Sequence, residues 1–565
     1  MILLVFVCCS HARPIDQDST KSVFKYREIY LPEAIGSNAD TLGLNTLDSD
    51  WAIWGHNLGR VLPEKPSESI YAKVNGVVNK SQFCFSSNRL FEYICDFIDN
   101  EYGPNDHSRF AIIPNDNDIV CLCVRCVEAG NTKDDVSPAV FNMVKRLAER
   151  YPNHIFYTSD YRTTKNLPKE QMPPNTGVMV SAMDYPLSYA ATPEEVSFLN
   201  VLSQWGEKTH RILIWDYINN FDDYFTPYPI FGVMQNRLKN YRDNNVTAVF
   251  LNGSGTDASS FSHIKSLVLA EITANPDQDW KEILRQKATE LYPVSGETVS
   301  DFIIAQENFI QENGKSLPLY EGVKVALDTY LPESQFVEFY KKLSELKDKA
   351  KGKEREELET LLAELSLTRL ELNRIHGNVK DSKMYLDQLE SLGKKNISIY
   401  SESGWPVERY IRDYRNILSH HHASRGKNKL AGVSLEALTP LDEEYRDLSL
   451  LTDGLLGMPS NYHNGNLITS PEKETKIAIP NKGIGKKIVA WFSVNPSFRI
   501  ALPEEVTLTG EGIDPISLTP ELIPEMPGHA RVEFDIPSGL TGSYVLTVKK
   551  EPDTKSMAIE EIEIY

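Results

Sequence analysis

The feature that most constrains the fold is a repeating strand, loop and helix pattern in the first half of the chain, from Phe24 to about Asn275. Short apolar runs indicate buried strands, and the amphipathic stretches between many of them indicate helices. Eight strands within about 250 residues match a (β/α)8 TIM barrel. The strand candidates are residues 24–31, 41–47, 82–86, 110–113, 155–159, 178–182, 211–215 and 246–251. The helix candidates are residues 90–100, 140–151, 193–205, 231–243 and 261–273.

Two regions of different character follow the barrel, which predicts a multidomain α/β protein. Lys/Glu-rich segments such as residues 339–372 carry apolar side chains at three- and four-residue spacing. That spacing predicts an α-helical domain over residues 281–430, after a barrel domain over residues 21–280. From about Leu435, short alternating segments separated by Pro and Gly turns predict an all-β sandwich over residues 431–565.

Charge and the N-terminal segment limit the partners and the location. The 565 residues carry a formal net charge of −20, which argues against nucleic acid or an anionic membrane, because both require a basic face. Residues 1–20 begin with a short apolar run that ends in small residues, as a secretory signal does. Cys8 or Cys9 stands where a bacterial lipoprotein signal is cleaved. We therefore expect an exported periplasmic or cell-surface lipoprotein, anchored by lipid to the outer membrane. A disordered N-terminus is the alternative, and the oligomeric state stays open.

An amide and a carboxylate, Asn115 and Asp116, follow the predicted fourth strand. In a barrel enzyme, polar residues at the carboxyl ends of strands face the ligand crevice. Glycoside cleavage needs a carboxylic acid to protonate the leaving oxygen, and burial at a strand end keeps such a group protonated near neutrality. An asparagine both donates and accepts, so Asn115 suits a substrate amide. The alternative is a plain Asn-Asp-Asn-Asp turn.

Further candidates for substrate contact follow other strands or lie on the loop before the third strand. Asp184 and Asp216 each suit a base, a sugar-hydroxyl ligand or an orienting carboxylate, and a helix cap is the alternative. Aromatic rings pack on sugar C–H faces, which favours the Trp215-Asp216-Tyr217 run. Arg27, in the first strand, would be costly inside a barrel unless a site carboxylate paired with it. The predicted substrate-binding set is Arg27, His56, Asn57, Tyr161, Asp184, Trp215, Asp216, Tyr217 and Asn252.

The cysteines form a local cluster rather than a disulfide framework spread over the chain. Cys121, Cys123 and Cys126 make a C-x-C-x-x-C run, a spacing at which thiolates bind zinc. Structural zinc normally takes four ligands, so Cys84, Cys95 or a histidine would have to complete the set. A local disulfide or free thiols are the alternatives, and we expect no metal and no other cofactor at the catalytic site.

Several segments together resemble a known family. The segments PNDND, CLCVRC, WGHN, QFCFSSN, IWDYINNF and TPYPIF, in their order and spacing, resemble domain of unknown function 4838, now largely treated as glycoside hydrolase family 163. The resemblance covers roughly residues 24–280. It implies a (β/α)8 barrel and an endo-β-N-acetylglucosaminidase acting on N-glycans, with Asn115 and Asp116 matching the polarising residue and the acid. Asn115 departs from several related families, which place a carboxylate there. The segments LTDGLLG and NYHNGN look like the entry of a galactose-binding-like sandwich.

The leading hypothesis is therefore a glycosidase that binds an oligosaccharide or a glycoprotein glycan and retains configuration through the substrate's own acetamido group. In this scheme Asp116 donates the proton, and Asn115, helped by Asp216, holds the acetamido N–H. An α-glucuronidase-like or other two-carboxylate glycosidase, using Asp116 with Asp184 or Asp216, is the rival within the class. A non-catalytic glycan-binding protein is the rival outside it, because fold does not fix activity.

Overall fold

The computed structural model describes residues 22–442, 446–459, 467–469, 472–480, 485–536, 542–551 and 556–565. The predicted signal segment, with Cys8 and Cys9, and the segment NYHNGN lie outside the described residues. The chain divides into two compact units, of which the first contains most of the chain up to Leu319 and the second most of the chain after it. The domain border expected at residue 280 therefore falls inside the first unit, which also contains the next two helices.

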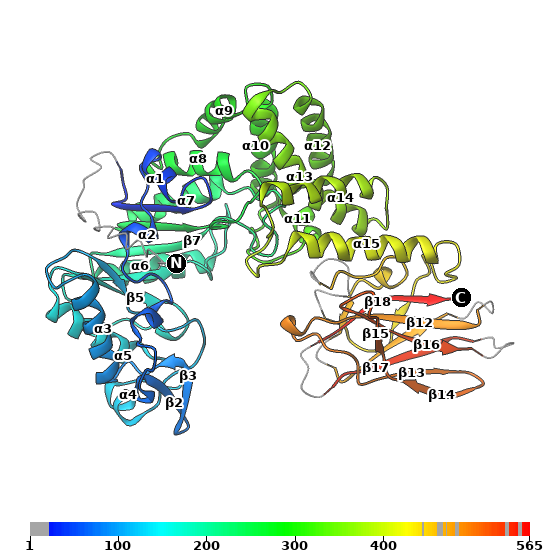
Figure 1. The fold of residues 1–565 in the computed structure, drawn as a ribbon, viewed down its shortest axis with the longest axis horizontal. Helices are drawn as coiled ribbons and strands as arrows, with labels where there is room; N and C mark the ends of the chain where they lie inside the picture. Colours follow the sequence, from blue (N-terminus) through cyan, green and yellow to red (C-terminus); the bar gives the residue numbers. More distant parts are fainter. Residues whose placement is uncertain are drawn as a thin grey trace, which may run out of the picture. The chain divides into compact units, whose positions relative to one another are not determined.

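The first unit is built on a parallel sheet, in which β5 and β7 are labelled in Figure 1. The sheet has six strands in the order β1-β8-β7-β6-β5-β4. Neighbouring strands of this sheet pair as they would in a barrel, but the two edge strands, β1 and β4, do not pair with each other. All six overlap predicted strands, because apolar runs are what a sheet buried on both faces requires. The strands are β1 (Tyr26–Tyr30), β4 (Arg109–Ala111), β5 (Ile155–Asp160), β6 (Thr176–Ser181), β7 (Ile212–Tyr217) and β8 (Ala248–Asn252).

The sheet does not close into the predicted eight-stranded barrel, since the second predicted strand is wrong. Residues 41–47 end helix α1 (Ser37–Thr41) and begin helix α2 (Leu47–Asp50). The segment 44–53 nevertheless spans the gap between the two edge strands, and we call it the seam. The Asn45 amide donates to the Arg27 carbonyl of β1 (2.8 Å), and the Ala111 amide of β4 donates to the Ile53 carbonyl (2.8 Å).

The third predicted strand is also wrong as a barrel strand. Its residues, 82–86, overlap the end of β3 (Val77–Phe83), which pairs antiparallel with β2 (Tyr71–Val74) in a separate hairpin. The turn of this hairpin is Asn75-Gly76, both with positive φ, 51° and 80°. An Asn-Gly pair between apolar-containing runs is a strong hairpin signal, because both residues tolerate the left-handed region that the turn needs.

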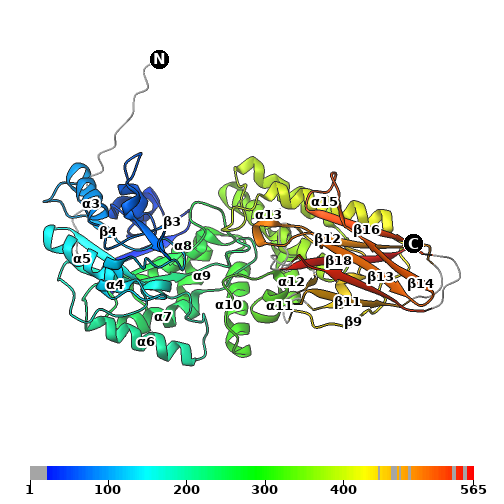
Figure 2. The ribbon, with the colours of Figure 1, turned by 90° about the horizontal axis from the view of Figure 1, so that it is seen from below.

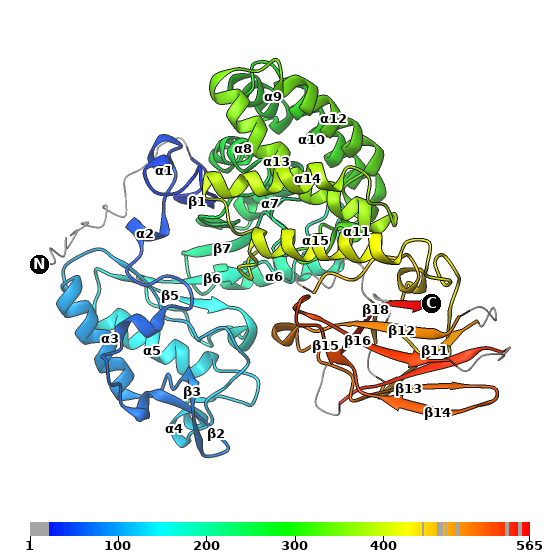
Figure 3. The ribbon, with the colours of Figure 1, turned by 45° about the vertical axis from the view of Figure 1, so that its right-hand side comes forward.

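Helices cover the outer face of the sheet. Helices α6 and α7 lie beside β6 and β7 (Figure 3), and α3, α4 and α5 gather with the β2–β3 hairpin (Figure 1). The predicted helices are found where expected. The helices of the first unit are α1, α2, α3 (Asn88–Glu101), α4 (Val124–Ala129), α5 (Ser137–Arg150), α6 (Pro193–Gly206), α7 (Phe231–Asp243), α8 (Ser262–Ala274), α9 (Trp280–Leu291) and α10 (Gly296–Asn313).

Two apolar cores occupy the two faces of the sheet. The inner core is rich in aromatic rings and contains Trp51, Tyr157 and Phe250, whereas the outer core packs Phe110 and Phe156 against α3 and α5. Neighbouring residues of one strand therefore belong to different cores, as the two-residue period of a strand requires. This alternation decides which side chains after each strand point toward the barrel interior.

The second unit combines helices with the predicted β-sandwich. Two antiparallel five-stranded sheets, β10-β18-β12-β16-β15 and β14-β13-β17-β11-β9, share one apolar core, and α15 lies along the first of them (Figure 2). Among the described residues, no helix combines the length and the apolar character needed to cross a membrane. The helices are α11 (Val323–Thr329), α12 (Glu333–Lys347), α13 (Gly352–Ile375), α14 (Ser382–Glu390) and α15 (Val407–Ser424). The strands are β9 (Glu436–Ala437), β10 (Leu467–Thr469), β11 (Glu474–Ile479), β12 (Lys487–Ser493), β13 (Glu505–Gly510), β14 (Ile513–Leu518), β15 (Glu521–Leu522), β16 (His529–Asp535), β17 (Tyr544–Lys549) and β18 (Met557–Ile564).

Candidate functional site

Aromatic rings form the floor of the partial barrel near the carboxyl ends of its strands. Trp54, just after the seam, stacks on Trp215 of β7, with ring centroids 5.3 Å apart and planes 18° apart. Both rings contact Phe250 of β8 edge-on, at 4.7 and 4.8 Å. Trp215 is half-buried, so part of this aromatic floor faces solvent. Indole faces of this kind are surfaces on which sugar C–H groups pack.

His56 and Tyr161 connect this floor to the loop after β4. The His56 ring lies 6.0 Å from the Tyr161 ring, and its Nδ1 makes a 2.6 Å hydrogen bond with the Pro114 carbonyl. Gly55, between Trp54 and His56, has a φ of 54° and lies against the Trp215 ring, where a Cβ would come within 3.5 Å. Burial raises the pKa of the Tyr161 phenol, and the neighbouring Asp116 carboxylate adds to the rise.

The loop after β4 carries a carboxylate pair that shares one guanidinium. Arg162, just after β5, donates from Nη1 to Asp116 (3.1 Å) and from Nε and Nη2 to the two oxygens of Asp118 (2.9 and 2.7 Å). We call these three residues the clamp. Asp116 is 52% exposed and Arg162 36% exposed, so the clamp lies at the surface of the rim. Hydrogen bonding from Arg162 lowers the pKa of Asp118.

Arg162 is the residue of this site that the sequence pattern did not predict. Its backbone has a φ of 49°, in the left-handed region that a long side chain rarely occupies. Strain of this kind gathers at functional sites, where surrounding contacts hold it in place. The bidentate bond to Asp118 and the bond to Asp116 supply those contacts. The sequence signal that could have found it is its place directly after the fifth strand.

A buried glutamine of the β2–β3 hairpin holds the same loop from the other side. The Gln82 amide oxygen accepts from the Asn115 backbone (3.0 Å), and its nitrogen donates to the Asn115 carbonyl and the Asn117 side chain (3.0 Å each). The Asn115 side chain donates to the Ser81 carbonyl (2.9 Å). Asn115 is therefore directed toward the hairpin, and Asp116 toward Arg162, so the two neighbours serve different partners.

Asp216 is a correction to the predicted set. It is fully buried on the outer face of β7, where Arg237 of α7 donates to its Oδ1 (2.5 Å) and Tyr241 donates to its Oδ2 (2.5 Å). The carboxylate thus belongs to a buried ion pair between sheet and helix. It cannot assist Asn115 with a substrate amide, because the strand separates it from the aromatic floor.

Arg27 is a second correction. It also points outward, since its guanidinium donates to the Ala270 carbonyl (2.9 Å) near the end of α8 and to the Gly43 carbonyl (2.6 Å). Cations suit the carbonyl end of a helix, which carries partial negative charge. No site carboxylate is involved, so the expected pairing across the barrel interior is wrong.

The other predicted residues lie at the rim in varied roles. Asp184 is 77% exposed and pairs with Lys165 (2.5 Å), and Asn57 donates to the Trp54 carbonyl (3.0 Å) and so supports its own turn. Tyr217 of β7 is buried, and Asn252 at the end of β8 is half-buried beside it in register. The structure thus gathers His56, Tyr161, Trp215 and Asp116 along one connected path and leaves Asp184 exposed with Lys165.

Six parallel strands around an aromatic interior, with charged side chains after the strand ends, define a partial α/β barrel whose rim is the usual place for a binding site. The model of the family described as domain of unknown function (DUF4838) matches residues 19–303, about half of the chain, and the chain belongs to this family. No curated protein matches the chain.

The chain is distantly similar to solved structures of two glycoside hydrolases and a lectin domain. A family GH115 4-O-methyl-α-glucuronidase with specificity for decorated arabinogalactans is 12% identical, with a TM-score of 0.38 over 88% of this chain and 70% of that one. A GH138 enzyme targeting pectin rhamnogalacturonan II is 9% identical, with a TM-score of 0.26 over 88% and 79%. The lectin domain of lectinolysin complexed with Lewis B antigen is 15% identical, with a TM-score of 0.19 over 25% and 96%. These scores are too low to transfer a site or an activity.

Proposed function

We propose that the chain is a glycoside hydrolase whose substrate lies on the aromatic floor, with Asp116 as the general acid. The observation that carries the proposal is the series of contacts from the Trp54–Trp215 stack, through His56 and Tyr161, to Arg162, which bonds to the Asp116 carboxylate. Stacked indoles bind a sugar ring by its apolar face, and a carboxylic acid at the edge of that surface can reach a glycosidic oxygen.

In the proposed reaction Asp116 first leaves Arg162 and becomes covered by the sugar. Covering the carboxyl excludes bulk water from the place where it meets the glycosidic oxygen. The acid then protonates the leaving oxygen, while the acetamido oxygen of an N-acetylglucosaminide attacks the anomeric carbon. Water opens the resulting oxazoline, with Asp116 now acting as the base. Within this scheme the Asn115 side-chain oxygen, without help from Asp216, is the acceptor for the acetamido N–H, and the side chain has to leave the Ser81 carbonyl to reach it.

The finer features of the proposal rest on the resemblance of the sequence to glycoside hydrolase family 163. They are endo action, β-N-acetylglucosaminide specificity, N-glycan substrates and export as a periplasmic or cell-surface lipoprotein. Of the two-carboxylate schemes, the one with Asp216 loses support because Asp216 lies on the outer face of β7.

A non-catalytic glycan-binding protein is the second candidate, and the clamp favours it. Asp116 is exposed and its carboxylate already bonds to Arg162, an arrangement that suits holding polar groups of a ligand rather than reaching a glycosidic oxygen. The two candidates share the aromatic floor and differ only in what Asp116 does.

Substituting the proposed acid separates them. We expect Asp116→Asn to lower the release of sugar from a desialylated complex N-glycan and from a chromogenic N-acetylglucosaminide by at least about 10²-fold, with binding retained, because proton transfer is lost. The matched control is Asp301→Asn, an exposed carboxylate on α10, which should leave turnover unchanged. Unchanged turnover in Asp116→Asn would remove this residue from the mechanism, and glycan binding without any release by the wild type would establish the second candidate.

The aromatic floor has a test of its own. We expect Trp215→Ala to weaken glycan binding roughly ten-fold, about 1.4 kcal/mol, since a ring face that packs on the sugar is lost. Isothermal titration calorimetry with the released glycan measures this. The control is Tyr320→Ala, which removes an exposed aromatic ring away from the floor. Trp205→Ala would not serve, because the Trp205 ring is buried and donates a hydrogen bond to Asp160. Equal affinities of Trp215→Ala and the wild type would place the sugar elsewhere.

A further inference from the structure

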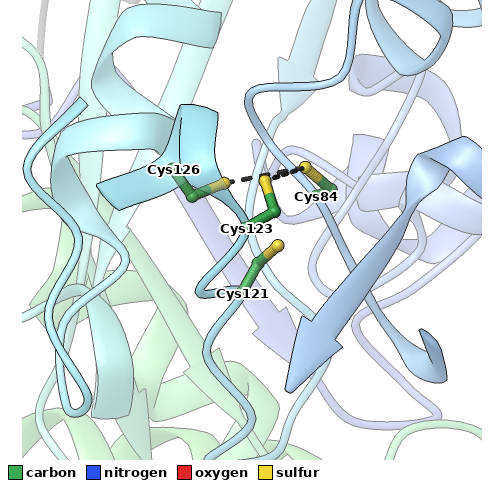
Figure 4. Close-up of side chains that lie close together, drawn as sticks. All are labelled: Cys84, Cys121, Cys123 and Cys126. Atoms are coloured by element: carbon green, nitrogen blue, oxygen red, sulfur yellow. Dashed lines mark hydrogen bonds between the residues drawn. The ribbon is translucent and has the colours of Figure 1, made fainter. Parts of the chain in front are cut away.

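Four cysteines from two separate segments meet beside the β2–β3 hairpin (Figure 4). Cys84 directly follows β3, whereas Cys121, Cys123 and Cys126 belong to the loop after β4 and the first turn of α4. Their four sulfur atoms all lie within 4.8 Å of one another. The Cys84 sulfur lies 3.6 Å from that of Cys126 and 3.7 Å from that of Cys123.

These separations fit a shared ion and not a disulfide. A disulfide bond joins sulfurs at about 2.05 Å, and all four cysteines are free thiols in the structure. Four thiolates around a tetrahedral zinc ion, each about 2.3 Å from it, lie about 3.8 Å from one another. The two measured sulfur–sulfur distances are close to that value.

The surroundings of the sulfurs also suit thiolate ligands. Cys84, Cys121 and Cys126 are buried and Cys123 is half-buried, so the cluster is largely shielded from water. The Lys73 backbone amide donates to the Cys121 sulfur (3.2 Å), and the Ser86 hydroxyl lies 3.3 Å from the Cys126 sulfur. Hydrogen bonds of this kind orient metal ligands from outside the coordination shell. Cys95, on α3, is not a member of the group.

We propose that Cys84, Cys121, Cys123 and Cys126 bind one structural zinc ion. Four protein ligands leave no open position for water or substrate, so the ion has a structural role and takes no part in hydrolysis. It would join the hairpin to the loop after β4, in the part of the first unit where the expected barrel strand is missing. Gln82, two residues before Cys84, bonds to Asn115 and Asn117, so the ion also fixes the loop that carries Asp116 and Asp118.

Metal analysis of the purified full chain tests the proposal. We expect about one zinc ion per chain and no other transition metal, and we expect Cys84→Ser to lose most of it. Cys95→Ser is the matched control, because this buried cysteine lies outside the group and should leave the zinc content unchanged. Finding iron in place of zinc would overturn the assignment. Finding no metal would overturn it as well, whether the four cysteines are then free thiols or form a disulfide.

A second measurement covers the case in which Cys84→Ser fails to fold. Titration of the wild type with a thiol-modifying mercurial, followed with a zinc-sensitive dye, should release the zinc in proportion to the modification of four thiols. Zinc released without thiol modification by a weak chelator alone would point to a surface site and contradict the proposal. Because the predicted loss is of metal and not of activity, this result stands apart from the tests of Asp116 and Trp215.

Discussion

Arg237→Leu is expected to destabilise the first unit by about 3–5 kcal/mol, because it leaves the Asp216 carboxylate buried without its counter-ion. Both side chains are almost completely buried, and their contact is 2.5 Å. Burial alone would lower the pKa of Arg237, but the charge of Asp216 raises it above its usual value. Urea denaturation followed by tryptophan fluorescence measures the effect. The first unit contains most of the tryptophans: Trp51, Trp54, Trp205, Trp215 and Trp280.

The matched control lies on the same helix. Arg242 also pairs with carboxylates, Asp243 and Asp277, but at the surface, where water and salt screen the interaction. Arg242→Leu should therefore change stability little. The double variant Asp216→Leu with Arg237→Leu should recover much of the loss, because no uncompensated charge remains. If Arg237→Leu and Arg242→Leu had equal effects, the buried ion pair would not be a major contributor to stability.

Glu28→Gln is expected to stabilise the protein at alkaline pH and not at acidic pH. Glu28 is fully buried in β1, where Tyr26 donates to one oxygen and the Leu47 amide to the other (2.9 Å). Burial raises the pKa of Glu28 from 4.5 to about 8, even though these two hydrogen bonds lower it. The folded state therefore keeps a proton that the unfolded state releases between these two values.

The sign of the pH dependence follows from linkage. Stability is fully present below the unfolded pKa and falls as pH rises toward about 8, by at most about 1.4 kcal/mol per pH unit. The Glu28→Gln variant lacks this loss, so its advantage over the wild type should grow from pH 4 to pH 8 by on the order of 3 kcal/mol. Denaturation curves at several pH values give the difference. Glu149→Gln, at an exposed position of α5, is the control, and a pH-independent difference for Glu28→Gln would show that the carboxyl is not held neutral.

The sequence predicts the parallel sheet well and its closure poorly, for a physical reason. Buried parallel strands need continuous apolar runs, and such runs mark residues 155–159, 211–215 and 246–251 clearly. Residues 41–47 contain no such run, and Thr46 instead caps α2 by accepting from the Ser49 amide. Asn75-Gly76 predicts the β2–β3 hairpin, because both residues tolerate the positive φ of its turn. The assignment of residues 82–86 to a barrel strand conflicts with that signal.

The sequence predicts which residues lie near the strand ends of the candidate site but not the direction of their side chains. A polar or aromatic residue at a strand end marks the rim, and this rule alone puts Asp116, Tyr161 and Trp215 in one region. Which neighbour faces inward cannot be read from a strand that is apolar on both faces, and so the predictions for Asp216 and Arg27 fall on the wrong side. Pairings between distant segments, such as Arg162 with Asp118 or Cys84 with Cys126, leave no local pattern at all.

The seam has a consequence for how proteins with this fold can vary. A strand inside a closed cylinder cannot change length without shifting the register of both neighbours. Residues 44–53 meet β1 and β4 through only a few backbone bonds, at Asn45, Ala52 and Ile53. Changes of length between those points leave the pairings of the six-stranded ladder unchanged, provided that Trp51 keeps its place in the inner core. Because Trp54 and His56 follow directly, changes of length here would move the aromatic floor and the His56 ring without altering the strands that support them.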